Sequence, residues 1–292
     1  MSAYLRLGAL VSLSILVPTV LSAQKQPRTI FVDAVDGAGK PVLDLTMADF
    51  EVDEAGAART VSRAGLANGP MRIILMVDTT DGAERWQSGI KTGLTDLLEA
   101  IPQPHEIGVV TIGRQFRIHA QPMTDHVKLK DTVNKLGKDG GGNLLLDGLR
   151  EAETRFMKKE GVRWPVYVIL TTDAALDNNM QVEEVNKMFA DMVARATTFH
   201  VVGLQNTGPT ATTEIGQTLA KNSGGTYTML TTTNALQTKL REIGMQIAEG
   251  HQKMSSRYQV EYVSEAVGPG AAVSVGISRP GVSRTVSFRR PF

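Results

Sequence analysis

No cysteine occurs among the 292 residues of the chain, and neither sign of charge is in clear excess. The lack of cysteine excludes disulfide bonds and lipoprotein attachment through a cysteine, so packing alone must stabilise the fold. Lysine and arginine number 31 against 30 aspartate and glutamate residues, which argues against a general attraction to nucleic acid or anionic membranes. Hydrophobic residues make up 42% of the chain, enough to form the core of one large domain or two. A globular, non-basic protein is therefore expected.

The N-terminus differs in composition from the rest of the chain. Arg6 is followed by an apolar stretch over residues 7–17, by Pro18 and by the small residues Ser22 and Ala23. This pattern is typical of a secretory signal peptide over residues 1–23, because the apolar run is shorter than the roughly 18 to 20 residues that span a bilayer. An uncleaved membrane anchor is the alternative, because Leu21 stands where signal peptidase prefers a small residue. The sequence thus predicts an exported protein, periplasmic or extracellular, with no membrane span after cleavage.

Two segments at the ends of the mature chain have the alternating pattern of β-strands. The N-terminal β segment, residues 24–69, contains "TIFV" and the stretch "DFEVDEAGAARTVSRA", in which Gly56 marks a turn between strands. The C-terminal β segment, residues 253–292, contains "RYQVEYV", "AVSVGIS" and "RTVSF". Three strands are too few for an independent core, so we expect the two segments to join in one small β-sandwich-like module.

Residues 70–252 between these segments alternate buried strands with amphipathic helices. Arg72 to Val77 is a nearly continuous apolar run, which is typical of a strand that is buried on both faces. Similar runs at 107–112, 166–170 and 198–204 are separated by segments with apolar residues at helical spacing. The stretch "TDHVKLKDTVNKLG" predicts a helix that is capped at Thr124 or Asp125 and stopped by Gly137. The pattern indicates a doubly wound α/β domain with a mostly parallel sheet, inserted between the two β segments.

Oxygen-bearing side chains lie in three of the loops between the predicted strands and helices. Asp78 and Thr80 come directly after the first buried strand, Asn143 lies in "GGGNLLLDGL", and Asp173 follows the strand that ends at Leu170. Ligands of open parallel sheets bind beyond the carboxyl ends of the strands, where the strand order reverses. We therefore expect these loops to form one binding surface.

At these residues the sequence resembles a von Willebrand factor A-type (vWA) domain, whose metal-ion-dependent adhesion site (MIDAS) combines D-x-S-x-S with a later threonine and a later aspartate. The chain after residue 28 also resembles the secreted bacterial proteins called VWFA-related, which carry segments like "DGAGKPVLDLTMADFEVDEAG" and "VSVGISRPGVS". The resemblance implies a Rossmann-like fold for residues 70–252. It also implies a role in binding another protein through a hard cation, Mg²⁺ or Mn²⁺, whose last ligand is an Asp or Glu carboxylate of the partner.

The metal motif is incomplete. The resemblance implies four metal-binding residues: Asp78, Thr80, Asn143 and Asp173. Gly82 stands where the second serine hydroxyl of the motif belongs, and Asn143 stands in place of the threonine. Mg²⁺ demands near-ideal ligand geometry, so two interpretations are open. Either the site still binds the ion, or Asp78, Thr80 and Asn143 are helix-capping and turn residues and Asp173 satisfies backbone N–H groups of a loop.

No catalytic motif was found. The sequence has no G-x-x-x-x-G-K-[ST] phosphate loop, no G-x-S-x-G nucleophile elbow and no H-E-x-x-H, and its five histidines are scattered. We therefore expect a non-enzymatic, exported protein-binding module of the adhesion or scaffold type, with no cofactor other than the metal. One alternative is a structural envelope component whose β module is the working part. The other is a metal-assisted hydrolase, which is disfavoured because no motif places a nucleophile or a general base beside the aspartates.

Overall fold

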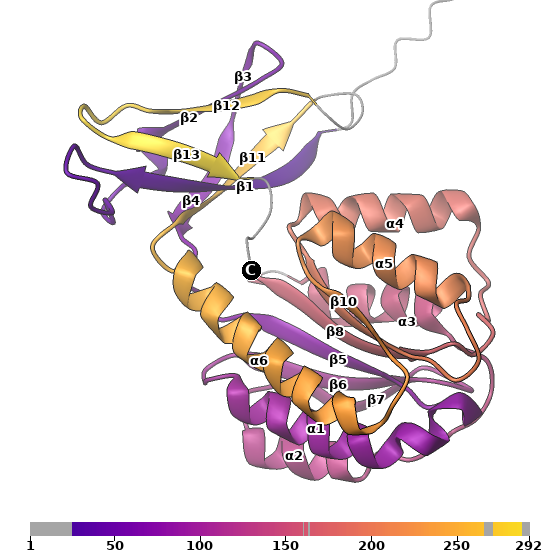
Figure 1. Cartoon of the computed structure of the whole chain (residues 1–292). Coiled ribbons are helices and arrows are strands. Elements are labelled where there is room, and N and C mark those ends of the chain that lie inside the picture. The colour runs from indigo at the N-terminus through magenta and orange to yellow at the C-terminus, as the bar shows by residue number, and fades with distance from the viewer. Residues whose placement is uncertain (1–24, 160, 163, 266–270, 288–292) are drawn as a thin grey trace, which may run out of the picture.

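A computed structural model describes residues 25–159, 161–162, 164–265 and 271–287. The expected signal peptide, residues 1–23, lies outside the described residues. Two parts are visible in Figure 1: an α/β part with a central sheet and a smaller part made of β-strands. Among the described helices, none is both long and apolar enough to cross a membrane.

The α/β part is built on a six-stranded sheet with the order β10-β9-β8-β5-β6-β7. Neighbouring strands are parallel except for the β6 and β7 pair, which is antiparallel. The strands of the sheet are β5 (Arg72–Asp78), β6 (Glu106–Ile112), β7 (Arg117–Met123), β8 (Pro165–Thr172), β9 (Thr198–Leu204) and β10 (Tyr227–Leu230). After β5 the chain proceeds to one side of the sheet, and from β8 onward it proceeds to the other. The strand order therefore reverses between β5 and β8.

Both faces of this sheet are covered by helices, as Figure 1 shows. Side chains of β5 alternate between two cores: Ile73 and Leu75 pack in one, and Ile74 and Met76 in the other. The first core is completed by α1 (Gln87–Ala100), α2 (His126–Asn134) and α6 (Asn234–Met254), and the second by α3 (Leu145–Ala152), α4 (Val182–Ala194) and α5 (Ala211–Ser223). The continuous apolar run of the sequence is explained by this burial on two sides.

The β module is formed by strands from both ends of the described chain. One sheet has the order β13-β1-β11-β4 and the other β12-β2-β3. The N-terminal strands are β1 (Gln26–Val35), β2 (Phe50–Glu54), β3 (Ala57–Arg59) and β4 (Val61–Leu66), and the C-terminal ones are β11 (Tyr258–Ser264), β12 (Val273–Ile277) and β13 (Ser283–Ser287). Each sheet contains strands from both segments, and one apolar core lies between the sheets. The predicted fold class, an α/β domain inserted into a β-sandwich-like module, is confirmed.

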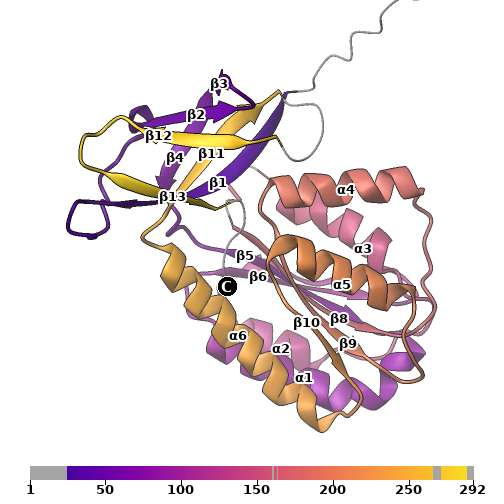
Figure 2. The same cartoon turned by 45° about the horizontal axis from the view of Figure 1, so that its top comes forward.

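The two chain crossings between the parts lie side by side. The amide of Ala67 donates to the carbonyl of Arg257 over 2.7 Å, directly beyond the β4–β11 pair. His251, near the end of α6, makes a 2.9 Å hydrogen bond through Nε2 to the carbonyl of Gly69. We call these two crossings, residues 67–71 and 251–257, the connector. The connector lies at the N-terminal ends of β5 and β6, so the carboxyl ends of the parallel strands face away from the β module, as Figures 1 and 2 show.

Candidate functional site

The candidate site lies at the carboxyl ends of β5 and β8, where the strand order reverses. Asp78 is the last residue of β5, and Thr172 is the last residue of β8. The site is surrounded by residues 79–86, which include the 3-10 helix η2 (Asp81–Trp86), and by the loops 113–115, 138–143, 173–179 and 205–208, and we call this set the rim. The predicted site residues Asp78, Thr80, Asn143 and Asp173 all belong to the rim or border it.

The carboxylate of Asp78 is buried and accepts hydrogen bonds on both oxygens. Its Oδ1 accepts the amide N–H of Thr80 over 2.8 Å. Its Oδ2 accepts from the amide and the hydroxyl of Thr172, at 2.8 and 2.6 Å, and from the side-chain amide of Asn143 at 2.8 Å. The hydroxyl of Thr80 lies 3.3 Å from that of Thr172. Neutral donors therefore surround Asp78, which compensates for the loss of water around its charge.

The side-chain amide of Asn143 has a defined orientation. Its Oδ1 accepts the backbone N–H of Leu145 over 3.0 Å at the start of α3, and its Nδ2 donates to Asp78 and to the hydroxyl of Thr171. The flipped orientation would place the oxygen against the Asp78 carboxylate and the amino group against a backbone N–H. Asn143 thus accepts the first backbone N–H of α3 and binds Asp78 at the same time.

Asp173 faces a different loop from Asp78. Its Oδ2 accepts the backbone amides of Asn206, Thr207 and Gly208, and its Oδ1 accepts the side-chain amide of Asn206 over 3.0 Å. Partial burial opposes ionisation of this carboxyl group, but the three backbone donors outweigh it and hold the pKa of Asp173 below its ordinary value. These hydrogen bonds match the alternative interpretation of Asp173 as a loop aspartate that satisfies backbone N–H groups.

Asn206 connects three loops of the rim. Its Oδ1 accepts the indole N–H of Trp86 over 3.0 Å, and its Nδ2 donates to the carbonyl of Gly82 and to Asp173, at 3.0 Å each. An indole nitrogen can only donate, so the orientation of this amide is also fixed. Asn206 was not among the residues expected from the sequence, although it follows β9 at the same edge of the sheet.

Few positive charges of the rim are free to meet a ligand. Arg85 donates to the carbonyl of Gln205 and lies over the ring of Trp86. Lys138 forms ion pairs with Asp81 and Glu84, at 3.4 and 3.1 Å. Arg114 is exposed and, within the described part of the chain, has no side-chain hydrogen bond or ion pair. Arg114 is thus the one unpaired cation of the described rim.

Known proteins resemble this chain in structure. No protein-family model matches it, and no curated protein matches it in sequence. A von Willebrand factor type A structure from Catenulispora acidiphila is similar with a TM-score of 0.51 and 11% identity, covering 90% of this chain and 72% of that one. Proximal thread matrix protein 1 from the mussel byssus is similar with a TM-score of 0.50 and 14% identity, covering 76% of this chain and 50% of that one.

The α/β part of the chain has the von Willebrand factor A-type fold. The strand order, the antiparallel edge strand β7 and the helices on both faces form the A-type domain. Its rim is the edge at which the resemblance places the metal site.

The arrangement at the rim of the A-type domain does not fit a hard cation. Octahedral Mg²⁺ or Mn²⁺ needs several oxygen ligands that converge on one point. Here Asn143 presents its amino group to Asp78, and the carboxylate of Asp173 is bound by the loop after β9. Within the described residues, no three Asp, Glu, His or Cys side chains are grouped so as to hold a metal. Metal binding by Asp78, Thr80, Asn143 and Asp173 therefore stays a prediction from the sequence motif.

Proposed function

We propose that the chain is an exported, non-enzymatic protein-binding module that contacts its partner through the rim of the A-type domain. The observation that carries this proposal is the hydrogen-bonded network of Asp78, Asn143, Asp173 and Asn206. It ties loops from distant parts of the sequence into one surface at the end of the molecule remote from the β module. A fixed surface loses little conformational entropy on binding, which favours specific recognition.

The chemistry of the rim supports binding over catalysis. Both oxygens of Asp78 and both oxygens of Asp173 accept hydrogen bonds, so neither carboxylate is poised to remove a proton from a substrate. The hydrolase alternative makes a distinct prediction: turnover of a hydrolysable substrate, with or without Mn²⁺, that Asp78→Ala abolishes. Such turnover would contradict the proposal.

Arg114 indicates which chemical group the partner presents to the rim. Its guanidinium is exposed and unpaired within the described residues, and this planar group binds a carboxylate through two parallel hydrogen bonds. We therefore expect the partner to present an Asp or Glu side chain at the rim, received by Arg114. The mussel protein has been solved with zinc in its MIDAS motif, so ion-mediated capture of the same carboxylate is the alternative to be tested.

Export is part of the proposal. It rests on the signal-peptide pattern of residues 1–23 and implies a periplasmic or extracellular site of action. Edman sequencing or mass spectrometry of the protein from its source cells would test it, with a mature N-terminus at Gln24 as the expected result.

The decisive experiment distinguishes the rim from the β module. A photo-crosslinking amino acid is placed at Ala175 in the rim or at Ala58 in β3, both of which are exposed alanines. We expect a partner from the cell envelope to crosslink at Ala175 and not at Ala58. The reverse pattern would favour a structural component whose β module is the working part.

The crosslinked partner then allows a quantitative test. Arg114→Ala should weaken its binding about 10- to 100-fold, because a charge-assisted hydrogen bond contributes roughly 1.5 to 3 kcal/mol. The matched control is Arg241→Ala, since Arg241 is an exposed arginine of α6 that also has no ion pair within the described chain. Equal affinities of both variants would show that Arg114 does not receive the partner.

A further inference from the structure

We infer that two asparagine amides, those of Asn143 and Asn206, occupy the role that a metal ion has in the A-type domain, so that the rim is set without a divalent cation. Whether the rim binds a divalent cation can be tested without any partner. Its failure would leave the proposed binding function intact.

The first amide replaces the ion at Asp78. A cation stabilises a buried carboxylate by placing positive charge against its oxygens. An N–H donor does the same with a partial positive charge. Asn143 Nδ2 lies 2.8 Å from Asp78 Oδ2 and also 2.8 Å from the hydroxyl oxygen of Thr171. To offer its oxygen to an ion instead, Asn143 would have to give up these two bonds and its bond to the Leu145 amide.

The second amide helps to bind Asp173 to the loop after β9. Asn206 and the two residues after it direct their N–H groups at the Asp173 carboxylate, which is thereby committed to the loop after β9. The indole of Trp86 fixes the amide of Asn206 from the other side. An ion between Asp78 and Asp173 would therefore have to break up the packing of this loop as well.

The lack of a side chain at Gly82 leaves room for the second amide, that of Asn206. A Cβ atom at this position would lie 3.2 Å from Nδ2 of Asn206 and 3.1 Å from the hydroxyl oxygen of Thr172. A serine, which the metal motif has here, would crowd the amide that donates to the carbonyl of Gly82. The two departures from the metal motif, Gly82 and Asn143, are thus accompanied by two amides that hold the carboxylates in place.

The test exchanges one amide for a carboxylate of the same shape. In Asn143→Asp, two carboxylates meet where Nδ2 now lies 2.8 Å from Asp78, and their repulsion should be relieved by a bound cation or, at low pH, by a shared proton. The control is Asn134→Asp, because Asn134 is exposed at the end of α2 and has no side-chain hydrogen bond within the described residues. The full chain is melted in EDTA and in Mg²⁺, Mn²⁺ or Ca²⁺.

We expect no ion to shift the melting midpoint of the wild type or of Asn134→Asp. Asn143→Asp should melt lower in EDTA by about 5 °C or more and recover in Mn²⁺. If this variant does not fold in EDTA, the readout is the fraction that folds when Mn²⁺ is added. A wild-type midpoint that rises with an ion, or saturable Mn²⁺ binding by the wild type in calorimetry, would overturn the inference. Failure of Mn²⁺ to rescue Asn143→Asp would overturn it too.

Discussion

Gly141 packs directly against the backbone of Arg114. A Cβ atom built on Gly141 would lie 2.5 Å from the Cα atom of Arg114, closer than non-bonded carbon atoms can approach. The φ of Gly141 is +80°, a left-handed conformation that residues with a side chain rarely adopt. The loop 138–143 and the turn after β6 are therefore held together by a contact that only glycine permits.

Replacing Gly141 with alanine should loosen this part of the rim. We expect Gly141→Ala to lower the free energy of unfolding by about 2 kcal/mol or more, because left-handed backbone strain costs roughly 1 to 2 kcal/mol and the methyl group adds a clash. Urea denaturation measures the change. Gly137→Ala, directly before this loop, is the control, since a Cβ there meets nothing within 4 Å. Equal losses for the two variants would show that the contact with Arg114 is unimportant.

A buried carboxylate organises the β module. Glu54 of β2 accepts hydrogen bonds from Arg28, Tyr262 and Ser264, and Arg59 lies 3.4 Å from its second oxygen. Burial alone would raise the pKa of Glu54, but the Ser264 and Tyr262 hydroxyls and the Arg28 charge outweigh it, and the pKa lies below its ordinary value of 4.5. The ionised group thus joins strands from both ends of the chain.

Removing this carboxylate should destabilise the β module in a pH-dependent way. A depressed pKa in the folded state contributes stability that is present above pH 4.5 and is lost as the pH falls below it. We expect Glu54→Gln to cost about 3 kcal/mol at pH 7 and less at pH 4, because the partly buried Arg28 loses its charge partner and the partly buried Arg59 keeps only Glu265. Urea denaturation at both pH values measures this difference. Glu51→Gln, on the exposed face of the same strand, should have no effect at either pH.

His200 should make the A-type domain sensitive to acid. This side chain is fully buried in β9, and burial lowers its pKa from 6.5 to about 4. Because the unfolded chain binds the proton first, the stability that His200 contributes is complete above pH 6.5 and is lost between pH 6.5 and 4. We expect wild-type stability to fall by about 2 kcal/mol between pH 7 and pH 5 through this residue. The pH slope in His200→Leu should be smaller by that amount, and an unchanged slope would contradict this assignment.

The apolar patterns of the sequence predicted most of the sheet. The runs at 72–77, 107–112 and 198–204 correspond to β5, β6 and β9, because side chains that face two helix layers must be apolar at every position. Helix ends were less well predicted. The helix expected to continue to Gly137 ends at Asn134, where the amides of Lys135 and Leu136 turn back to the carbonyls of Thr132 and Val133. Bonds to the third preceding carbonyl tighten the last turn and end the α-helix early.

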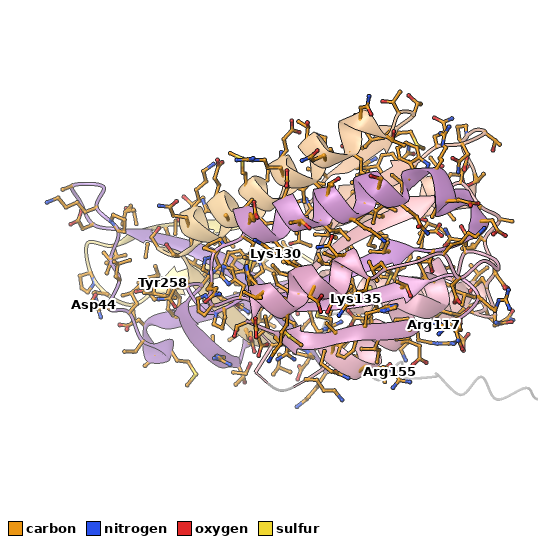
Figure 3. All side chains as sticks on the ribbon, turned by 90° about the horizontal axis from the view of Figure 1, so that it is seen from below. Asp44, Arg117, Lys130, Lys135, Arg155 and Tyr258 are labelled. Atoms are coloured by element: carbon orange, nitrogen blue, oxygen red, sulfur yellow. The ribbon has the colours of Figure 1, made fainter. Side chains whose placement is uncertain are left out.

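Side-chain partners could not be deduced from the sequence. Asn143 was expected to offer an oxygen to an ion or to cap a helix. In the structure the N-cap of α3 is Leu144, and Asn143 accepts the N–H of Leu145 while its nitrogen faces Asp78. The five histidines are scattered in the sequence, yet the rings of His105 and His251 lie 4.5 Å apart beside the connector. The partners of surface charges could not be deduced from the sequence either. Figure 3 shows Arg117 on the α/β part, and its ion-pair partner, Asp139 at 3.0 Å, lies in a separate loop.

The order of hydrophobic and polar residues, with glycines at turns, determined by itself that the chain has strands buried on two sides, amphipathic helices and polar loops after the strands. This information is local, because it depends on the spacing of residues along one element. Only the tertiary structure decided which atom of each polar side chain meets which neighbour. That choice depends on the relative positions of loops that are far apart in the chain, as for Asp78 with Thr172 and Asn206 with Gly82. Close packing of the interior fixes these positions, and no sequence spacing encodes them.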